Sequence, residues 1–206
     1  MKCGKVILPT KSEDEDQIDL LYKRGVKNGA SVKIISQKEL REIEPEASTI
    51  AQRALYSPNT SVIDPYAVLS KIQSELNNSD VIILFNEKVI SANPDQSTIT
   101  TNKDNNFKYK HLINCTGQYS DVVSKLFNVG KKYTLLPFKG LYYGLSKNSN
   151  IRLNGLIYPV PDLSVPFLGI HSVKLVNGSV YFGPTAIPAF GRENYQGFEG
   201  VNIKDA

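Results

Sequence analysis

The sequence has 206 residues, of which 41% are hydrophobic and 21% are charged. This composition is typical of a globular protein, and the length suits one large domain or two small ones with a buried core. The net charge of +4 comes from scattered lysines, so we expect no nucleic-acid partner. Two cysteines and two histidines without ligand spacing predict neither a disulfide framework nor a metal site.

The sequence contains no run of about 18 apolar residues, the length that a membrane-spanning helix requires. The opening stretch MKCGKVILPT has too short an apolar run for a signal peptide. We therefore expect a cytoplasmic protein without a transmembrane segment, and peripheral association with a membrane stays open.

The first third of the chain predicts alternating strands and helices. Short apolar runs predict strands at 5–8, 31–35 and 53–56. Ser12 and Glu15 have the spacing of a capping box, which predicts a helix that begins there. The same spacing at Ser36 and Glu39 predicts a second, shorter helix.

The middle third continues this alternation. Asp64 followed by Pro65 is typical of a helix start, and the apolar stripe behind it predicts a helix over 65–76. The continuous apolar runs 81–85 and 111–114 predict strands that are buried on both faces. Between these runs we expect an antiparallel meander with strands at 87–91, 97–101 and 107–109.

A helix is expected over 118–127, and the character of the chain then changes. From Tyr133 onward the sequence predicts strands joined by turns that contain proline or glycine. Alternating helices and strands followed by strands alone predict an α/β (α+β) fold, in which the second sheet forms a separate layer.

The stretch INCTGQYS has two interpretations. A buried strand ends at Asn114, and Cys115, Thr116 and Gly117 follow it. Small residues at the carboxyl end of a strand let the backbone come close to a ligand. A plain strand-to-helix turn explains the same pattern, and on the residues alone it is the simpler interpretation.

Two later stretches are candidates for substrate binding. In LPFKGLYYG, Lys139 precedes Tyr142 and Tyr143, which must face opposite sides of a strand. An ordinary half-buried strand is the alternative there. In FLGIHSVK, His171 is either a hydrogen-bonded core histidine or an imidazole that faces a pocket and takes a proton near neutral pH.

Several stretches, read in order, resemble the L-2-hydroxyglutarate oxidase/dehydrogenase family, FAD-dependent oxidoreductases of the D-amino-acid-oxidase and glycine-oxidase type. The resemblance covers essentially the whole chain and includes LYSPNTSVIDPYAV, LINCTGQYSD, PFKGLYYGL, GLIYPVPDLSVPFLGIH and NGSVYFGPTAIPAFGRENY. The run IYPVPDLSVPFLGIH is its most specific part, whereas the glycine turn is shared across the wider superfamily. The resemblance implies FAD as the cofactor and a small 2-hydroxy acid, foremost L-2-hydroxyglutarate, as the substrate.

The resemblance also assigns roles to residues near the cofactor. It places Val89 beside the adenine end of FAD through backbone contacts. It places the turn of Cys115, Thr116 and Gly117 close to the cofactor. The family pattern further implies a partial FAD-binding domain of the Rossmann-like type around these residues.

On the substrate side, the resemblance places Lys139, Tyr142, Tyr143 and His171 in strands that face the substrate. His171 is then the candidate catalytic base or hydroxyl-orienting group, while the C2 hydride of the substrate passes to the flavin. Lys139 is a candidate for attracting a substrate carboxylate, and a simply solvated lysine is the alternative.

The resemblance implies three segments: residues 1–63 as the N-terminal part of a substrate domain, 64–130 as a partial FAD-binding domain, and 131–206 as an antiparallel-sheet substrate domain. The GxGxxG turn and the closing glycine-rich segment of the family have no counterpart in this sequence. We therefore expect a central fragment that works with a complementary polypeptide carrying those segments. The alternatives are an inactive binding or interaction module and a fragment of a related amine or glycerol-3-phosphate oxidase.

Overall fold

The computed structural model describes residues 1–202, which form two compact units. Unit 1 combines residues 1–72 with 140–186, and unit 2 combines residues 73–139 with the segment from 187 onward. Helices, a mixed sheet and antiparallel sheets are all present, so the predicted α/β (α+β) class is confirmed. Within residues 1–202, no helix is both long and apolar enough to cross a membrane.

The two units are defined by contacts within the chain, whereas the three segments expected from the sequence are defined by their roles. Residues 1–63 share a sheet with most of 131–206, whereas the residues after Ala186 belong to unit 2. This grouping results from strand pairing between segments that are distant in the chain. Such pairing cannot be predicted from each segment of the sequence taken alone. The assignment of substrate and cofactor roles to the units stays a prediction.

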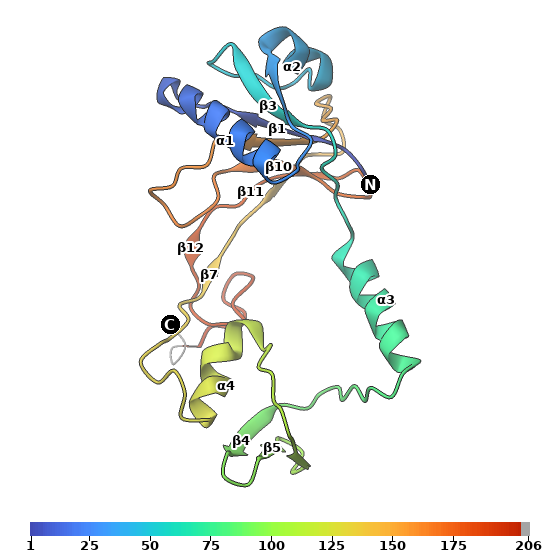
Figure 1. The fold of residues 1–206 in the computed structure, drawn as a ribbon, viewed down its shortest axis with the longest axis vertical. Coiled ribbons are helices and arrows are strands. Elements are labelled where there is room, and N and C mark those ends of the chain that lie inside the picture. Colours follow the sequence, from blue (N-terminus) through green and yellow to red (C-terminus); the bar gives the residue numbers. More distant parts are fainter. Residues whose placement is uncertain (203–206) are drawn as a thin grey trace. The chain divides into compact units, whose positions relative to one another are not determined.

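Unit 1 is built on a seven-stranded sheet with the order β2-β3-β1-β9-β10-β11-β8 (Figure 1). Neighbouring strands pair antiparallel except β1 and β9, which run parallel. The three strands predicted in the first third of the chain are confirmed to within two residues. The strands are β1 (Lys5–Leu8), β2 (Lys33–Ser36), β3 (Arg53–Ser57), β8 (Tyr143–Gly144), β9 (Leu156–Pro159), β10 (His171–Lys174) and β11 (Val180–Gly183).

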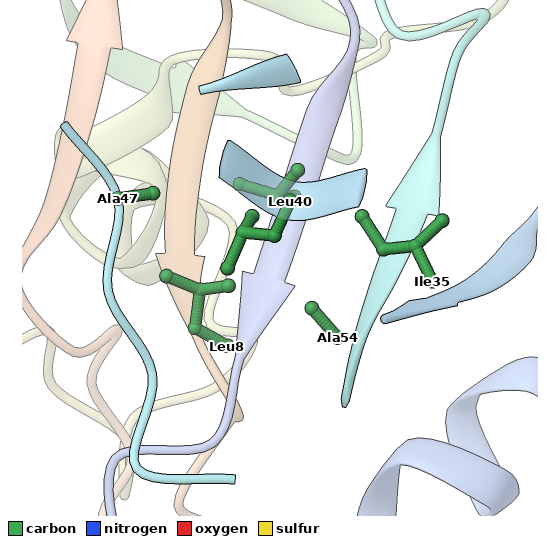
Figure 2. Close-up of a cluster of buried hydrophobic side chains, with 6 residues drawn as sticks. Leu8, Ile35, Leu40, Ala47 and Ala54 are labelled. Carbon is green, nitrogen blue, oxygen red and sulfur yellow. The ribbon is translucent and has the colours of Figure 1, made fainter. Parts of the chain in front are cut away.

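Two helices cover opposite faces of this sheet: α1 (Glu15–Lys27), which follows the 3-10 turn η1 (Ser12–Asp14), and α2 (Gln37–Ile43). On one face Leu40 of α2 is fully buried in a cluster made of Val6, Leu8, Ile35, Leu40, Ala47 and Ala54 (Figure 2). On the other face Ile18 of α1 is fully buried with Leu55 and Val160. Ile7 packs with the α1 cluster while its neighbours Val6 and Leu8 face α2, as the alternation of side chains along a strand requires.

The two predicted capping boxes have different outcomes. The Ser36 hydroxyl accepts from the Glu39 amide at 3.3 Å, and the Glu39 carboxylate accepts from the Ser36 amide at 2.7 Å, so this box is confirmed. The box predicted at Ser12 and Glu15 is wrong. Instead, the Asp14 carboxylate accepts from the backbone N–H groups of Thr10 and Lys11, so the side chain that caps this helix start is one residue earlier than predicted.

A buried carboxylate joins the two chain segments of unit 1. Glu44, directly after α2, is 1% exposed, and its oxygens accept from the Asn154 amide at 3.0 Å and from the Gly155 amide. The Asn154 side chain donates in return to the Ile43 carbonyl at 2.7 Å. Gly155 permits the close approach, because a Cβ there would lie 2.5 Å from the Cys3 carbonyl oxygen. Since β9 begins at the next residue, Glu44 fixes the start of the parallel pair.

Unit 2 contains the predicted meander and the predicted helix that follows it. The helix begins with a 3-10 turn, and α4 contacts β4. A further helix, α3 (Pro65–Asn77), confirms the prediction over 65–76 and crosses the boundary between the units. The elements of unit 2 are β4 (Val89–Asn93), β5 (Thr98–Thr101), β6 (Asn106–Lys108), η2 (Gly117–Tyr119), α4 (Ser120–Leu126), β7 (Phe138–Lys139) and β12 (Ile187–Pro188).

The buried strands predicted at 81–85 and 111–114 are wrong. Neither run is a strand, and the side chains of Ile82 and Ile113 are 82% and 84% exposed. No strand among residues 1–202 pairs with either run, and an extended apolar segment is buried on both faces only inside a sheet. Both runs therefore contribute exposed apolar surface to unit 2.

The interior of unit 2 is mainly polar. Within its described part, Ala189 is the only buried hydrophobic residue, and the buried polar residues are Thr101, Asp121, Arg192 and Asn194. Asp121 and Arg192 form a bidentate ion pair with N–O distances of 2.8 and 2.9 Å, and both side chains are less than 10% exposed. The hydrogen bonds from Arg192 lower the pKa of Asp121 to about 2, against the opposing effect of burial.

We expect Glu44→Gln to destabilise the protein. The amide nitrogen of glutamine cannot accept a hydrogen bond, so one of two buried backbone N–H groups loses its partner, at a cost of about 1–3 kcal/mol. For a chain of this length the melting temperature should fall by about 2–12 °C, as measured by circular dichroism. Glu42→Gln, on the exposed side of the same helix, is the matched control. A melting temperature equal to that of the unaltered chain would contradict the role given to Glu44.

The Asp121–Arg192 pair should make stability depend on pH in the acid range. Because the pKa of Asp121 is lowered in the folded chain to about 2, from an ordinary value of 3.8, its contribution is complete above pH 4 and is lost as the pH falls through 2. Urea unfolding of the unaltered chain and of Asp121→Asn should therefore differ at pH 7 and converge near pH 2. Asp95→Asn, in the exposed β4–β5 turn, should leave the unfolding free energy at pH 7 unchanged. A constant difference from pH 7 to 2 would show that the charge of Asp121 is not responsible.

Candidate functional site

His171 opens strand β10 and is buried, with 6% of its surface exposed. Its Nδ1 lies 2.9 Å from the Gly169 carbonyl oxygen. A carbonyl oxygen only accepts, so Nδ1 carries the hydrogen and donates it. The neutral ring then has an unprotonated Nε2, which is the nitrogen that can accept a proton.

Aromatic rings surround this imidazole. The Tyr158 ring stacks on His171 with the centroids 4.0 Å apart and the planes at 23°, and the Tyr142 ring meets it edge-on at 6.4 Å. Burial, and secondly the neighbouring Tyr142, raise the pKa of Tyr158, so its phenol stays neutral at physiological pH. The ammonium group of Lys5 lies 5.2 Å from the Tyr158 ring centroid and adds a positive charge beside the cluster.

The sheet itself places these rings together. His171 is paired in register with Gly183, and a Cβ at Gly183 would lie 2.8 Å from Cδ1 of Tyr142. Glycine at this position therefore leaves the space that Tyr142 occupies. A cavity of about 210 Å³ lies beside the cluster, with His171, Tyr158 and Phe182 in its wall. This volume is below the usual range for drug-sized ligands and suits a small molecule.

The glycine turn of unit 2 is exposed at Cys115, Thr116 and Gly117. The Asn114 side chain holds it from inside, because its oxygen accepts from the Thr116 amide at 3.2 Å and from the Thr116 hydroxyl at 2.7 Å. Gly117 has a φ of +54°, which favours glycine, and no atom lies within 4 Å of the place where a Cβ would be. The turn thus presents open backbone at its surface.

The remaining predicted cofactor contact, Val89, begins strand β4. The pairing of β4 with β5 shifts its register between Val89 and Ser91, which marks a β-bulge. A bulge changes the direction of the chain at that point. The cofactor roles of Val89, Cys115, Thr116 and Gly117 stay predictions.

The structure brings only some of the predicted substrate residues together. Tyr142 contacts His171, whereas Tyr143 on the adjacent position is 73% exposed. Lys139 belongs to unit 2, and its ammonium group donates to the side-chain oxygen of the buried Asn194 at 2.8 Å. The substrate roles of Lys139, Tyr142, Tyr143 and His171 also stay predictions.

Three residues that the sequence reading did not single out are central to these sites. Tyr158 lies in the most specific family-like run, IYPVPD, and its place beside His171 follows from the pairing of β9 with β10. Asp121 and Arg192 are 71 residues apart, and no local pattern links them. Among residues 1–202 there is no group of three or more potential metal ligands.

Comparison with curated proteins returns L-2-hydroxyglutarate dehydrogenases. The mitochondrial protein of Dictyostelium discoideum is 32% identical over 98% of this chain and 49% of its own length. The protein of Indibacter alkaliphilus is 34% identical over 94% and 49%, and that of Escherichia coli K12 is 29% identical over 94% and 46%. The chain thus spans about half the length of the curated relatives it matches.

Solved structures with the same fold include an oxidase and a dehydrogenase. L-α-glycerophosphate oxidase from Mycoplasma pneumoniae, with FAD bound, matches 93% of this chain and 51% of its own with a TM-score of 0.77 at 23% identity. L-Proline dehydrogenase from P. horikoshii has the same TM-score at 16% identity, over 92% of this chain and 51% of its own. The family model for FAD dependent oxidoreductases, DAO, matches residues 1–203. The chain therefore belongs to the DAO family of FAD dependent oxidoreductases.

Proposed function

We propose that this chain forms part of an FAD-dependent dehydrogenase that oxidises L-2-hydroxyglutarate to 2-oxoglutarate. The observation that carries the proposal is the match of nearly the whole chain to L-2-hydroxyglutarate dehydrogenases from bacteria, a slime mould and animals. The geometry around His171 supports it, because oxidation of a secondary alcohol needs a group that takes the hydroxyl proton.

In this proposal His171 is the catalytic base. Its Nδ1–H is held by the Gly169 carbonyl, so the lone pair of Nε2 receives the proton of the substrate hydroxyl as the C2–O bond becomes a carbonyl. A bound flavin would supply the acceptor for the two electrons and the hydrogen that leave C2. The stacked Tyr158 fixes the plane of the imidazole, and burial keeps bulk water from competing for the proton.

The substrate has two carboxylates, and the cluster carries a matching charge. Lys5 brings an ammonium group to the Tyr158 side of the imidazole, and Tyr158 keeps its hydroxyl proton because its pKa is raised. Both groups can donate hydrogen bonds to a carboxylate. The aromatic Tyr142 closes the edge of the ring that faces away from the stack.

The cofactor side of the proposal rests on unit 2. The open turn at Cys115, Thr116 and Gly117 is the surface that FAD would contact, through backbone that no side chain covers. The exposed apolar runs 81–85 and 111–113 are then the places where strands of the remaining flavin domain pair, supplied by a complementary polypeptide. Pairing there would bury both runs.

Activity should appear when the chain is co-expressed with the parts of the Escherichia coli dehydrogenase that it does not match. We expect a yellow complex that reduces an acceptor dye with L-2-hydroxyglutarate. His171→Asn should lower kcat about 10²- to 10⁴-fold, the usual contribution of a general base, with the flavin content unchanged. Glu42→Gln, an exposed position on α2 outside both candidate sites, is the control.

Each outcome of that experiment decides between functions. Dye reduction with glycine or glycerol 3-phosphate in place of L-2-hydroxyglutarate would assign the chain to a related amine or glycerol-3-phosphate oxidase. A colourless complex would favour an inactive binding module. Full activity of His171→Asn would show that His171 is not the catalytic base and is instead a core histidine.

Cofactor contact with the turn has a separate test. The chain has two cysteines, of which Cys115 is exposed and Cys3 is half-buried. In the Cys3→Ser background, FAD should slow the alkylation of Cys115 by iodoacetamide in the co-expressed complex, because a group lying against the turn covers the thiol. Riboflavin, which lacks the adenine end, is the ligand control. An alkylation rate that FAD leaves unchanged would place the cofactor elsewhere.

A further inference from the structure

The segment 192–195 binds residues that directly follow the glycine turn, at positions 118, 119 and 121. The Arg192 guanidinium donates to the Gln118 carbonyl, directly after Gly117, and to both carboxylate oxygens of Asp121. Glu193 accepts from the Tyr119 hydroxyl at 2.7 Å and from the Gln118 side chain at 2.9 Å. The turn and the segment that holds it are separated by more than 70 residues in the chain.

Of these contacts, those between Arg192 and Asp121 are buried. The Arg192 side chain is 6% exposed and that of Asp121 is 7% exposed. The guanidinium carbon also lies 5.7 Å from the Tyr119 ring centroid, within the range of a cation–π contact. A planar guanidinium can serve a carboxylate and a carbonyl at once, whereas the single ammonium group of a lysine cannot reproduce this geometry.

The turn 115–117 is anchored on one side and open on the other. Residues 118, 119 and 121 are tied down, while the space beside Gly117 is empty and Cys115, Thr116 and Gly117 are exposed. Asn114 adds a second anchor, since its amide nitrogen donates to the Ser120 carbonyl at 2.8 Å. A turn that is anchored on one side and open on the other already has the backbone conformation that a ligand meets. Binding then does not cost the entropy of ordering the turn.

We propose that Arg192 is a positioning residue that holds the turn 115–117 in the conformation that receives the cofactor. This inference rests on the proposed function for the identity of the ligand. The clamp, which is the set of contacts of Arg192 with Gln118 and Asp121, lies entirely within unit 2. Asp121 holds the guanidinium in place, and the Gln118 carbonyl transmits that position to the turn.

Amide hydrogen exchange of the full chain, followed by mass spectrometry without flavin, tests the clamp. The Thr116 and Tyr119 amides are hydrogen-bonded within the turn. In Arg192→Lys their exchange should accelerate by about tenfold or more, because loss of a hydrogen bond to a charged group shifts an opening equilibrium by that factor. Exchange in the meander 89–101 of the same unit should stay unchanged. Arg152→Lys, an exposed arginine of unit 1, is the matched control.

A second variant keeps the test decisive if Arg192→Lys does not fold. Glu193→Ala changes an exposed residue and removes the acceptor for Tyr119 and Gln118, so exchange at 116–119 should accelerate, by less than in Arg192→Lys. Unchanged exchange at 116–119 in both variants, or equal acceleration in the meander, would overturn the positioning role. If the co-expressed complex does not oxidise L-2-hydroxyglutarate while exchange responds as expected, the proposed function fails and the positioning of the turn by Arg192 stands.

Discussion

The parallel pairing of β1 with β9 is the constraint on which unit 1 depends. It joins residues 5–8 to residues 156–159 and so connects the N-terminal half of the sheet to the half that carries His171. Glu44, which is 1% exposed, secures the start of that pair by accepting hydrogen bonds from two backbone N–H groups. Without this junction, β9 and β10 would have no fixed relation to the helices that form the core, and Tyr158 and His171 would lack a common support.

The two units are stabilised by different kinds of interaction. Unit 1 has two apolar clusters on opposite faces of one sheet, the arrangement in which the hydrophobic effect contributes most. Unit 2 buries a charged pair and an asparagine, while its longest apolar runs lie at the surface. A buried ion pair gives specific geometry more readily than net stability. Unit 2 is therefore held by polar contacts around Asp121 and Arg192 more than by an apolar core.

Most features that depend on neighbouring residues could be predicted from the sequence, the capping box at Ser12 and Glu15 being an exception, and features that depend on distant partners could not. The Ser36–Glu39 box, the helix after Asp64 and the meander each need only local spacing, and all are present. The runs 81–85 and 111–114 have the composition of buried strands, but a strand also needs a neighbour to pair with. At the candidate sites, the sequence identified His171 and the glycine turn, whereas Tyr158 and Arg192 became visible only through the contacts that folding creates.

The order in which the chain leaves the ribosome adds a consequence to the β1–β9 junction. Lys5 pairs with Leu156, so β1 is synthesised about 150 residues before its parallel partner. At translation rates of about 5–20 residues per second, this edge of β1 waits for roughly 8–30 s with its backbone groups unpaired. During that interval β3 can already cover the other edge of β1, and α1 and α2 can already cover its faces. The nascent chain therefore presents an edge of β1 that is covered only after β9 is made, in addition to the edge of β2 that stays open in the folded sheet.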